Sequence, residues 1–227
     1  GALLSNAHCA SPLCNPSRTA LLTGRSPART GIYNNDQFWR ASLPDAVSLP
    51  DFLRRNGYFA AGAGKVFHHT AGNNPPAQWD DFQLQVFDDP WYRRADWYPW
   101  NKRIPAPPKH PFHGMRDFQG EFDWGDLEQD ELAYGDQRAV DYGIRHLAKQ
   151  HAKPWFLAIG LWHPHIPMFS PKRFWDLYPR EKIVLPNADP RDLEDLPKVA
   201  QDLAAFRRVE FDRIVREGKW AECVQAY

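Results

Sequence analysis

Two short apolar runs stand out along the chain, and both have the length of a strand. Residues 58–63 are small and apolar, and residues 155–161 are apolar without interruption. Continuous runs of this kind are typical of parallel strands that are covered on both faces of a sheet. We therefore predict a buried strand at each run, and we interpret residues 1–13 as the end of a further strand followed by a loop.

Helices are predicted before, between and after these runs. Pro16 stands near the start of the first helix and Gly24 at its end, while Ser48 caps a second helix that Gly57 stops. Helices that alternate with buried strands predict an α/β fold with a mainly parallel sheet. The predicted helices cover residues 16–24, 49–56, 130–150, about 174–177 and a final stretch with the apolar stripe Val209, Ile214, Val215, Trp220, Cys223, Val224 and Tyr227.

Residues 72–126 show neither the helical nor the strand periodicity of apolar residues, and they are rich in Pro, Trp and Asp. We expect a long, irregular excursion with short turns, in which the acidic pairs Asp80-Asp81 and Asp88-Asp89 are loop or turn residues. The excursion has two interpretations. Its aromatic and basic side chains form a rim that binds sugars, or its tryptophans pin a loop without a core to the body, which we favour. The side chains concerned are Trp91, Trp97, Trp100 and Trp124, with Arg93, Arg94, Lys102 and Arg103.

Composition narrows the class of protein. The 227 residues suffice for one large domain or two small ones, and 28 basic residues balance 28 acidic ones. This balance gives no electrostatic case for a nucleic-acid partner, and no apolar run approaches the roughly 20 residues of a membrane span. Three cysteines argue against a disulfide framework. The chain opens mid-pattern and closes inside a predicted helix, so we expect an internal fragment of a longer protein.

Cys14 and Arg18 form the first candidate site, in the string Cys14-Asn15-Pro16-Ser17-Arg18. If Pro16 opens a helix, Cys14 lies at the end where free N–H groups and the helix dipole favour an anion. Arg18 lies one turn further on the same side of the helix. This pattern indicates a nucleophile beside a cation. The alternative is a buried structural cysteine with Arg18 in a surface ion pair.

Two further candidate segments come directly after the predicted strands. Gly64-Lys65-Val66-Phe67-His68 offers a compact positive charge and an imidazole, and the segment 163–167 offers His165 between prolines. Ligands of parallel α/β sheets gather at the carboxyl ends of the strands. The alternatives are a solvated lysine and structural histidines. We expect no direct role for His69, and we interpret His163 as a structural or rim residue.

The longer strings resemble the type I sulfatases. Cys14-Asn15-Pro16-Ser17-Arg18 continues as Thr19-Ala20-Leu21-Leu22-Thr23-Gly24-Arg25, which is similar to the consensus of that family. The strings 64–68, 156–160, 164–167 and 174–179 resemble its iduronate-2-sulfatase-like branch. The resemblance covers the whole chain, most loosely over 72–126. It implies an alkaline-phosphatase-like fold, a mainly parallel sheet flanked by helices, of which residues 1–227 are the central part.

The resemblance also implies a mechanism. In that family a separate maturation enzyme, which reads Cys-x-Pro-x-Arg, oxidises the cysteine matching Cys14 to formylglycine, and the aldehyde hydrate is the nucleophile. The residues matching Arg18, Lys65 and His68 surround the sulfate, and His165 matches the donor to the leaving alcohol. The modified Cys14 is also a ligand of one divalent cation, Ca²⁺. The family's paired Asp residues are expected upstream of Gly1, and its Asp-His or Asp-Asn pair and a further Lys downstream of Tyr227, so we expect the fragment alone to be inactive.

We therefore expect a sulfuric ester hydrolase acting on a sulfated sugar or glycosaminoglycan. Two alternatives remain: a phosphodiesterase or phosphonate monoester hydrolase of the same superfamily, and a degenerate relative that only binds. The joint presence of Cys14, Arg18, Lys65, His68 and His165 speaks against degeneration. Family resemblance also leads us to expect a periplasmic, secreted or lysosome-like location.

Overall fold

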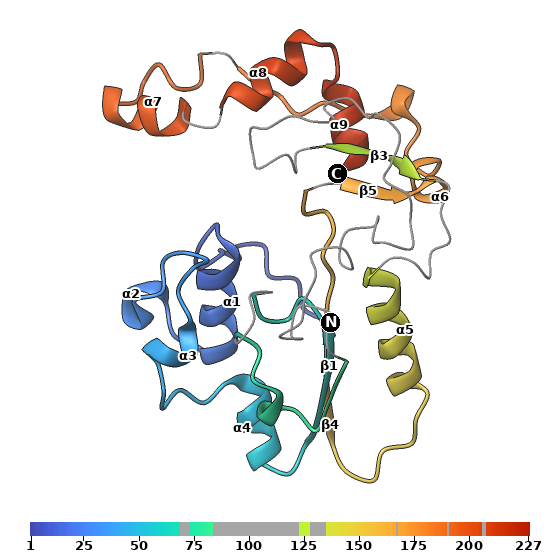
Figure 1. Cartoon of the computed structure of the whole chain (residues 1–227). Helices are drawn as coiled ribbons and strands as arrows, with labels where there is room; N and C mark the ends of the chain where they lie inside the picture. Colours follow the sequence, from blue (N-terminus) through green and yellow to red (C-terminus); the bar gives the residue numbers. More distant parts are fainter. Residues whose placement is uncertain (69–72, 84–122, 128–134, 167, 190, 206–207) are drawn as a thin grey trace. The chain divides into compact units, whose positions relative to one another are not determined.

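The computed structural model describes residues 1–68, 73–83, 123–127, 135–166, 168–189, 191–205 and 208–227 (Figure 1). The chain divides into a first unit, residues 1–105 and 131–162, and a second unit, residues 106–130 and 163–227. None of the helices in the described ranges combines the length and apolar character needed to cross a lipid bilayer.

A parallel sheet of three strands forms the centre of the first unit. Its strands are β1 (Phe59–Gly64), β2 (Asp81–Gln83) and β4 (Trp155–Gly160), in the order β2-β1-β4. The two strands predicted from the apolar runs are therefore confirmed, and the sheet is parallel, as predicted. Their registers align so that Gly64 lies opposite Gly160 at the carboxyl ends. The expectation of a turn at Asp81 is wrong, because this residue starts β2.

Helices lie on both sides of this sheet. Figure 1 shows α4 (Leu49–Arg55) on the same side as α1 (Cys14–Thr23) and α5 (Gly135–Leu147) on the opposite side. The shorter helices are α2 (Pro27–Thr30), α3 (Trp39–Ser42) and the 3-10 turn η1 (Pro76–Gln78). The fold class is therefore α/β, as predicted.

Two local predictions about the first unit are wrong. Residues 1–13 contain no strand. Ser48 does precede α4, but its hydroxyl donates to Gln78 Oε1 at 2.5 Å and caps no helix N–H. The reason is its burial, which puts the hydroxyl next to a buried amide. The end of the first predicted helix is confirmed, because Gly24 adopts φ 67° and donates its N–H to Ala20.

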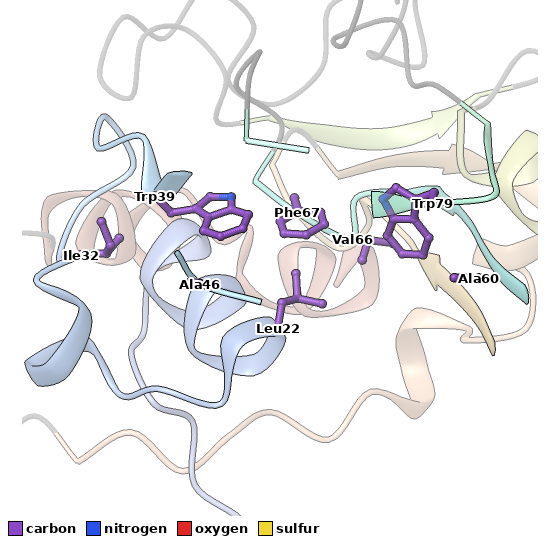
Figure 2. Close-up of a cluster of buried hydrophobic side chains, with 8 residues drawn as sticks. All are labelled: Leu22, Ile32, Trp39, Ala46, Ala60, Val66, Phe67 and Trp79. Carbon is purple, nitrogen blue, oxygen red and sulfur yellow. The ribbon is translucent and has the colours of Figure 1, made fainter. Parts of the chain in front are cut away.

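The core of the first unit follows the alternation of side chains along its strands. Ala60, Phe156 and Ala158 join a cluster on the α1 and α4 side, while alternate residues join a cluster with Ala139 and Tyr142 of α5. Figure 2 shows the buried members of the first cluster, Leu22, Ile32, Trp39, Ala46, Ala60, Val66, Phe67 and Trp79. The strand β4 is less buried than predicted: Trp155 is exposed and its other residues are half-buried, because within the described residues β4 pairs only with β1.

The aromatic part of this core anchors the loop that follows β1. Phe67 stacks on Trp39 with ring centroids 5.5 Å apart, and it meets Trp79 edge-on at 6.5 Å (Figure 2). Aromatic pairs of these geometries add about 0.5–1.5 kcal/mol to the stabilisation that comes from burial. The loop residues next to Phe67 are therefore fixed by the core and not by solvent-exposed contacts.

The carboxyl ends of β1 and β4 approach each other so closely that only glycine fits. Gly64 adopts φ +77°, and a Cβ on it would overlap the carbonyl of Gly160. A Cβ on Gly160 would in turn overlap the backbone carbonyl of Lys65. The Lys65 N–H donates to Gly160 O at 2.7 Å across this approach. The pair of glycines thus sets where the chain turns to present Lys65.

The second unit is built on a two-stranded parallel sheet of β3 (Trp124–Leu127) and β5 (Met168–Pro171). Its core comprises Trp124, Met168, Trp175 and Ile214, and the Trp124 indole N–H donates to Glu222 at 3.3 Å. The helical elements are α6 (Lys172–Trp175), η6 (Arg180–Lys182), α7 (Lys198–Ala205), α8 (Arg208–Arg216) and α9 (Trp220–Ala226).

Two sequence interpretations can be compared with this unit. The prediction of a single final helix is wrong, because Gly218 takes φ 66° and separates α8 from α9. Trp124 is fully buried and so pins its segment, as favoured above. The other excursion residues singled out for a rim or a turn lie outside the described residues: Asp88, Asp89, Trp91, Arg93, Arg94, Trp97, Trp100, Lys102 and Arg103.

We predict that Gly160→Ala lowers the free energy of unfolding by about 2 kcal/mol, since overpacking costs roughly 1–3 kcal/mol. The added methyl group must push the Lys65 carbonyl away and so disrupt the close approach of β1 and β4 at their carboxyl ends. Urea denaturation measures the change. The control is Gly135→Ala in α5, where the nearest atom lies 4.0 Å from the new Cβ. Equal unfolding free energies for both variants would contradict the crowding at Gly160.

Candidate active site

Cys14 is the first residue of α1 and is half-buried. The prediction that it lies at a helix start is confirmed. The expectation of several free N–H groups there is wrong. Asn15 N–H donates to Asn35 Oδ1 at 2.9 Å, Pro16 has no N–H, and Ser17 N–H donates to Leu13 O at 3.1 Å. Backbone donors of this turn are therefore largely occupied, and positive charge near Cys14 must come from side chains.

Asn15 fixes the position of this helix start. Its side chain is 1% exposed, and its Nδ2 donates to Asn34 O at 3.0 Å and to Gln37 O at 2.6 Å. With the bond to Asn35, three links tie the residue after Cys14 to one loop. Sequence reasoning treated this position as variable, because a neutral polar residue inside the motif gives no signal of which way its amide points.

Arg18 joins α1 to the loop after β1. Its Nη1 donates to the carbonyls of Lys65 and Val66, the second at 3.0 Å. Burial lowers the pKa of Arg18, and the neighbouring Cys14 opposes this shift. Guanidinium stays charged in proteins, so the link is a charge-assisted one. Arg18 therefore binds backbone carbonyls, and it forms no ion pair with a carboxylate in the described part of the chain, unlike in the alternative interpretation.

Lys65 is the side chain that meets Cys14. It is 2% exposed, and its Nζ lies 3.7 Å from Cys14 Sγ and 3.7 Å from the centre of the Trp162 ring. Burial lowers the pKa of Lys65 to about 8, although the nearby Cys14 and Asp136 favour its charged form. The alternative of a solvated lysine is wrong. The first unit thus brings an ammonium group, a thiol and a guanidinium group to the carboxyl end of β1.

Trp162 and Asp136 are neighbours of Lys65 that sequence reasoning missed. Trp162 is buried just beyond β4, and its backbone N–H donates to Asp136 Oδ1 at 2.6 Å. Asp136 lies in the first turn of α5. The two residues are 26 positions apart, so no local pattern could have paired them.

The two candidate histidines, His68 and His165, belong to different units of the chain. His68 is 5% exposed and lies three residues after Lys65, in the first unit. His165 belongs to the second unit, where its half-buried ring has Nδ1 2.6 Å from Ile166 O. This bond makes Nδ1 the donor and, in the neutral ring, leaves Nε2 as the acceptor. The described contacts therefore join Cys14, Arg18 and Lys65, with His68 on the same loop.

The acidic residues of the described ranges do not form a calcium site. Asp80 accepts the Ala60 N–H at 2.8 Å and pairs with Arg54, and Asp81 lies 3.0 Å from His146 Nε2. Across the described parts of the chain, no three His, Cys, Asp or Glu side chains converge. Calcium takes about 6–8 oxygen ligands. The described residues beside Cys14 are cationic, so they do not fit a cation by themselves.

Comparison with known proteins gives a consistent result. The family model described as "Sulfatase" matches residues 1–208. A "Sulfatase" of Formosa agariphila is 31% identical over 242 aligned positions, which cover 100% of this chain and 45% of that protein. Human "Iduronate 2-sulfatase" is 32% identical, covering 87% of this chain and 35% of that protein. "Choline-sulfatase" of Rhizobium meliloti is 28% identical, covering 76% and 33%. The chain spans less than half the length of each of these relatives.

A solved structure is similar in fold. It holds a protein in complex with its substrate D-glucosamine-2-N,6-O-disulfate, with a TM-score of 0.57 and 18% identity over 87% of this chain and 34% of that one. At this identity the likeness concerns the fold alone.

We predict that burial of Lys65 makes the stability of the chain depend on pH. The pKa of Lys65 is about 8 in the folded chain, below the roughly 10.4 of a lysine in water. Between these values the unfolded chain binds more protons, so the free energy of unfolding rises with pH. Urea denaturation from pH 7.5 to 10 measures it, and the rise should be smaller in Lys65→Met. Parallel curves for the two proteins would contradict the lowered pKa.

Proposed function

The chain belongs to the sulfatase family, and on this premise we propose that the protein containing it hydrolyses sulfate esters with residue 14 as the nucleophile. The observation that carries the proposal is the contact of the Lys65 ammonium with Cys14 Sγ at 3.7 Å, inside a buried site. We propose that a maturation enzyme converts Cys14 to formylglycine. In the chain as described, Sγ stands in for the hydrate oxygens of that residue.

The proposed reaction has two steps. One hydroxyl of the aldehyde hydrate attacks sulfur, the bond from sulfur to the ester oxygen breaks, and the alcohol leaves with a proton. The remaining hydroxyl then gives up its proton, the C=O bond of the aldehyde re-forms, and the C–O bond to sulfate breaks. Release therefore needs no attack of water on sulfur, and water only restores the hydrate.

The side chains take separate parts in this proposal. The Lys65 ammonium lies where negative charge develops on the sulfate oxygens, and a preformed charge in a buried site needs no reorganisation during the reaction. Arg18 donates a hydrogen bond to the Lys65 carbonyl and so keeps the loop that carries Lys65 against α1. His68 and His165 are the proposed proton-transfer groups, at the hydrate and at the leaving alcohol. The implied Ca²⁺ would need oxygen ligands other than the described residues.

A sulfated sugar is the substrate class that we propose. Support comes from the 32% identity to iduronate 2-sulfatase. A choline-sulfatase is also similar, at 28% identity. The sugar itself is left open in this proposal.

The test uses the full-length protein, co-expressed with a formylglycine-generating enzyme and assayed on 4-nitrophenyl sulfate and 4-nitrophenyl phosphate. We expect the sulfate to be preferred, and Cys14→Ala to abolish the activity. Lys65→Met should lower kcat by about 10²–10³-fold, the usual effect of removing one group that stabilises the transition-state charge. The matched control is Lys149→Met, an exposed lysine.

Preference for the phosphate ester would favour the phosphodiesterase or phosphonate hydrolase alternative. Activity on neither ester in a protein whose residue 14 is matured would favour a binding module. Full activity of Cys14→Ala would contradict the role of residue 14. The 227-residue chain assayed alone should be inactive.

A further inference from the structure

We propose that Trp162 is a positioning residue that holds the Lys65 ammonium against residue 14 through a cation–π contact. The inference rests on the proposed function for its effect on catalysis, and on the geometry for the contact itself. Lys65 Nζ lies 3.7 Å from the Trp162 ring centre, well inside the roughly 6 Å limit of such contacts. The same Nζ lies 3.7 Å from Cys14 Sγ.

The ring replaces water around a buried charge. Lys65 is 2% exposed and Trp162 is 8% exposed, so little solvent reaches the ammonium group. An ammonium group that loses its hydration needs a substitute, and the electron-rich face of an indole provides one. Lysine has a flexible four-carbon stem. Among the described residues, Trp162 is the aromatic side chain that contacts the end of this stem beside residue 14.

Packing also separates Trp162 from an ordinary core tryptophan. The described buried residues form three apolar clusters, and Trp162 is a member of none of them. Trp39, Trp79 and Trp124, by contrast, are members of these clusters. The face of the Trp162 ring is turned to a charge.

Asp136 links this contact to helix α5 of the first unit. Its carboxylate accepts a hydrogen bond from the Trp162 backbone N–H at 2.6 Å, and the same carboxylate favours the positive charge of Lys65. Three residues further along α5, Ala139 packs in the cluster with β1. The position of the ammonium group is therefore set by α5 through Asp136 and Trp162.

The experiment changes the ring face without changing the packing. Stop-codon suppression replaces Trp162 in the full-length, matured protein with tryptophans carrying one, two or three ring fluorines, which withdraw electron density from the face. We expect kcat on 4-nitrophenyl sulfate to fall stepwise, by about 2- to 10-fold over the series, with a smaller change in KM. The matched control is the same series at Trp155, in the adjoining strand β4, whose ring stacks on His151. A kcat that stays flat along the Trp162 series would overturn the proposal.

A second readout separates this proposal from the proposed function. In the 227-residue chain, the rate at which acetic anhydride acylates Lys65 at fixed pH is followed by peptide mass spectrometry. Loosening of the contact should raise this rate by about 2- to 10-fold along the Trp162 series, and leave it unchanged along the Trp155 series. If the full-length protein lacks sulfatase activity, the proposed function has failed, and the acylation rate alone decides: a rise supports the contact, and a constant rate overturns it.

Discussion

The close approach of β1 and β4 at their carboxyl ends is the constraint on which the candidate site depends. Gly64 and Gly160 leave no room for a Cβ, and the Lys65 N–H bonds to the Gly160 carbonyl across the gap. The side chain of Lys65 is thereby directed into the protein, where it is 2% exposed. Burying an ammonium group costs free energy unless other groups replace its water. The groups around Lys65 therefore decide whether the site is stable with this charge in it.

Those surroundings come from three parts of the first unit. The helix α1 brings Cys14, β4 continues into Trp162, and α5 brings Asp136. Two of these parts are held by separate contacts: α1 by the buried amide of Asn15 and by Arg18, and α5 by its contacts with the sheet. Cys14 and Lys65 are thus held by regular elements before any substrate binds, which is the arrangement that the proposed electrostatic catalysis requires.

The sequence was informative where one strong local pattern decides the structure. The apolar runs located β1 and β4, Gly24 located the end of α1, and the motif around Cys14 indicated the sulfatase family. Local patterns fail where a partner is distant in the chain: Ser48 bonds Gln78 and not its own helix, and Trp162 finds Lys65 and Asp136. The break at Gly218 had a visible signal, the glycine itself, which the apolar stripe on either side outweighed; in the structure this glycine takes a positive φ.

The most direct measurement of the central claim is the mass of the peptide that contains residue 14, from protein made together with a formylglycine-generating enzyme. We expect an aldehyde in place of the thiol of Cys14, and an unchanged thiol at Cys9, which is exposed and lies outside the motif. A Cys14 that keeps its thiol, in cells where a known sulfatase is matured, would contradict the account.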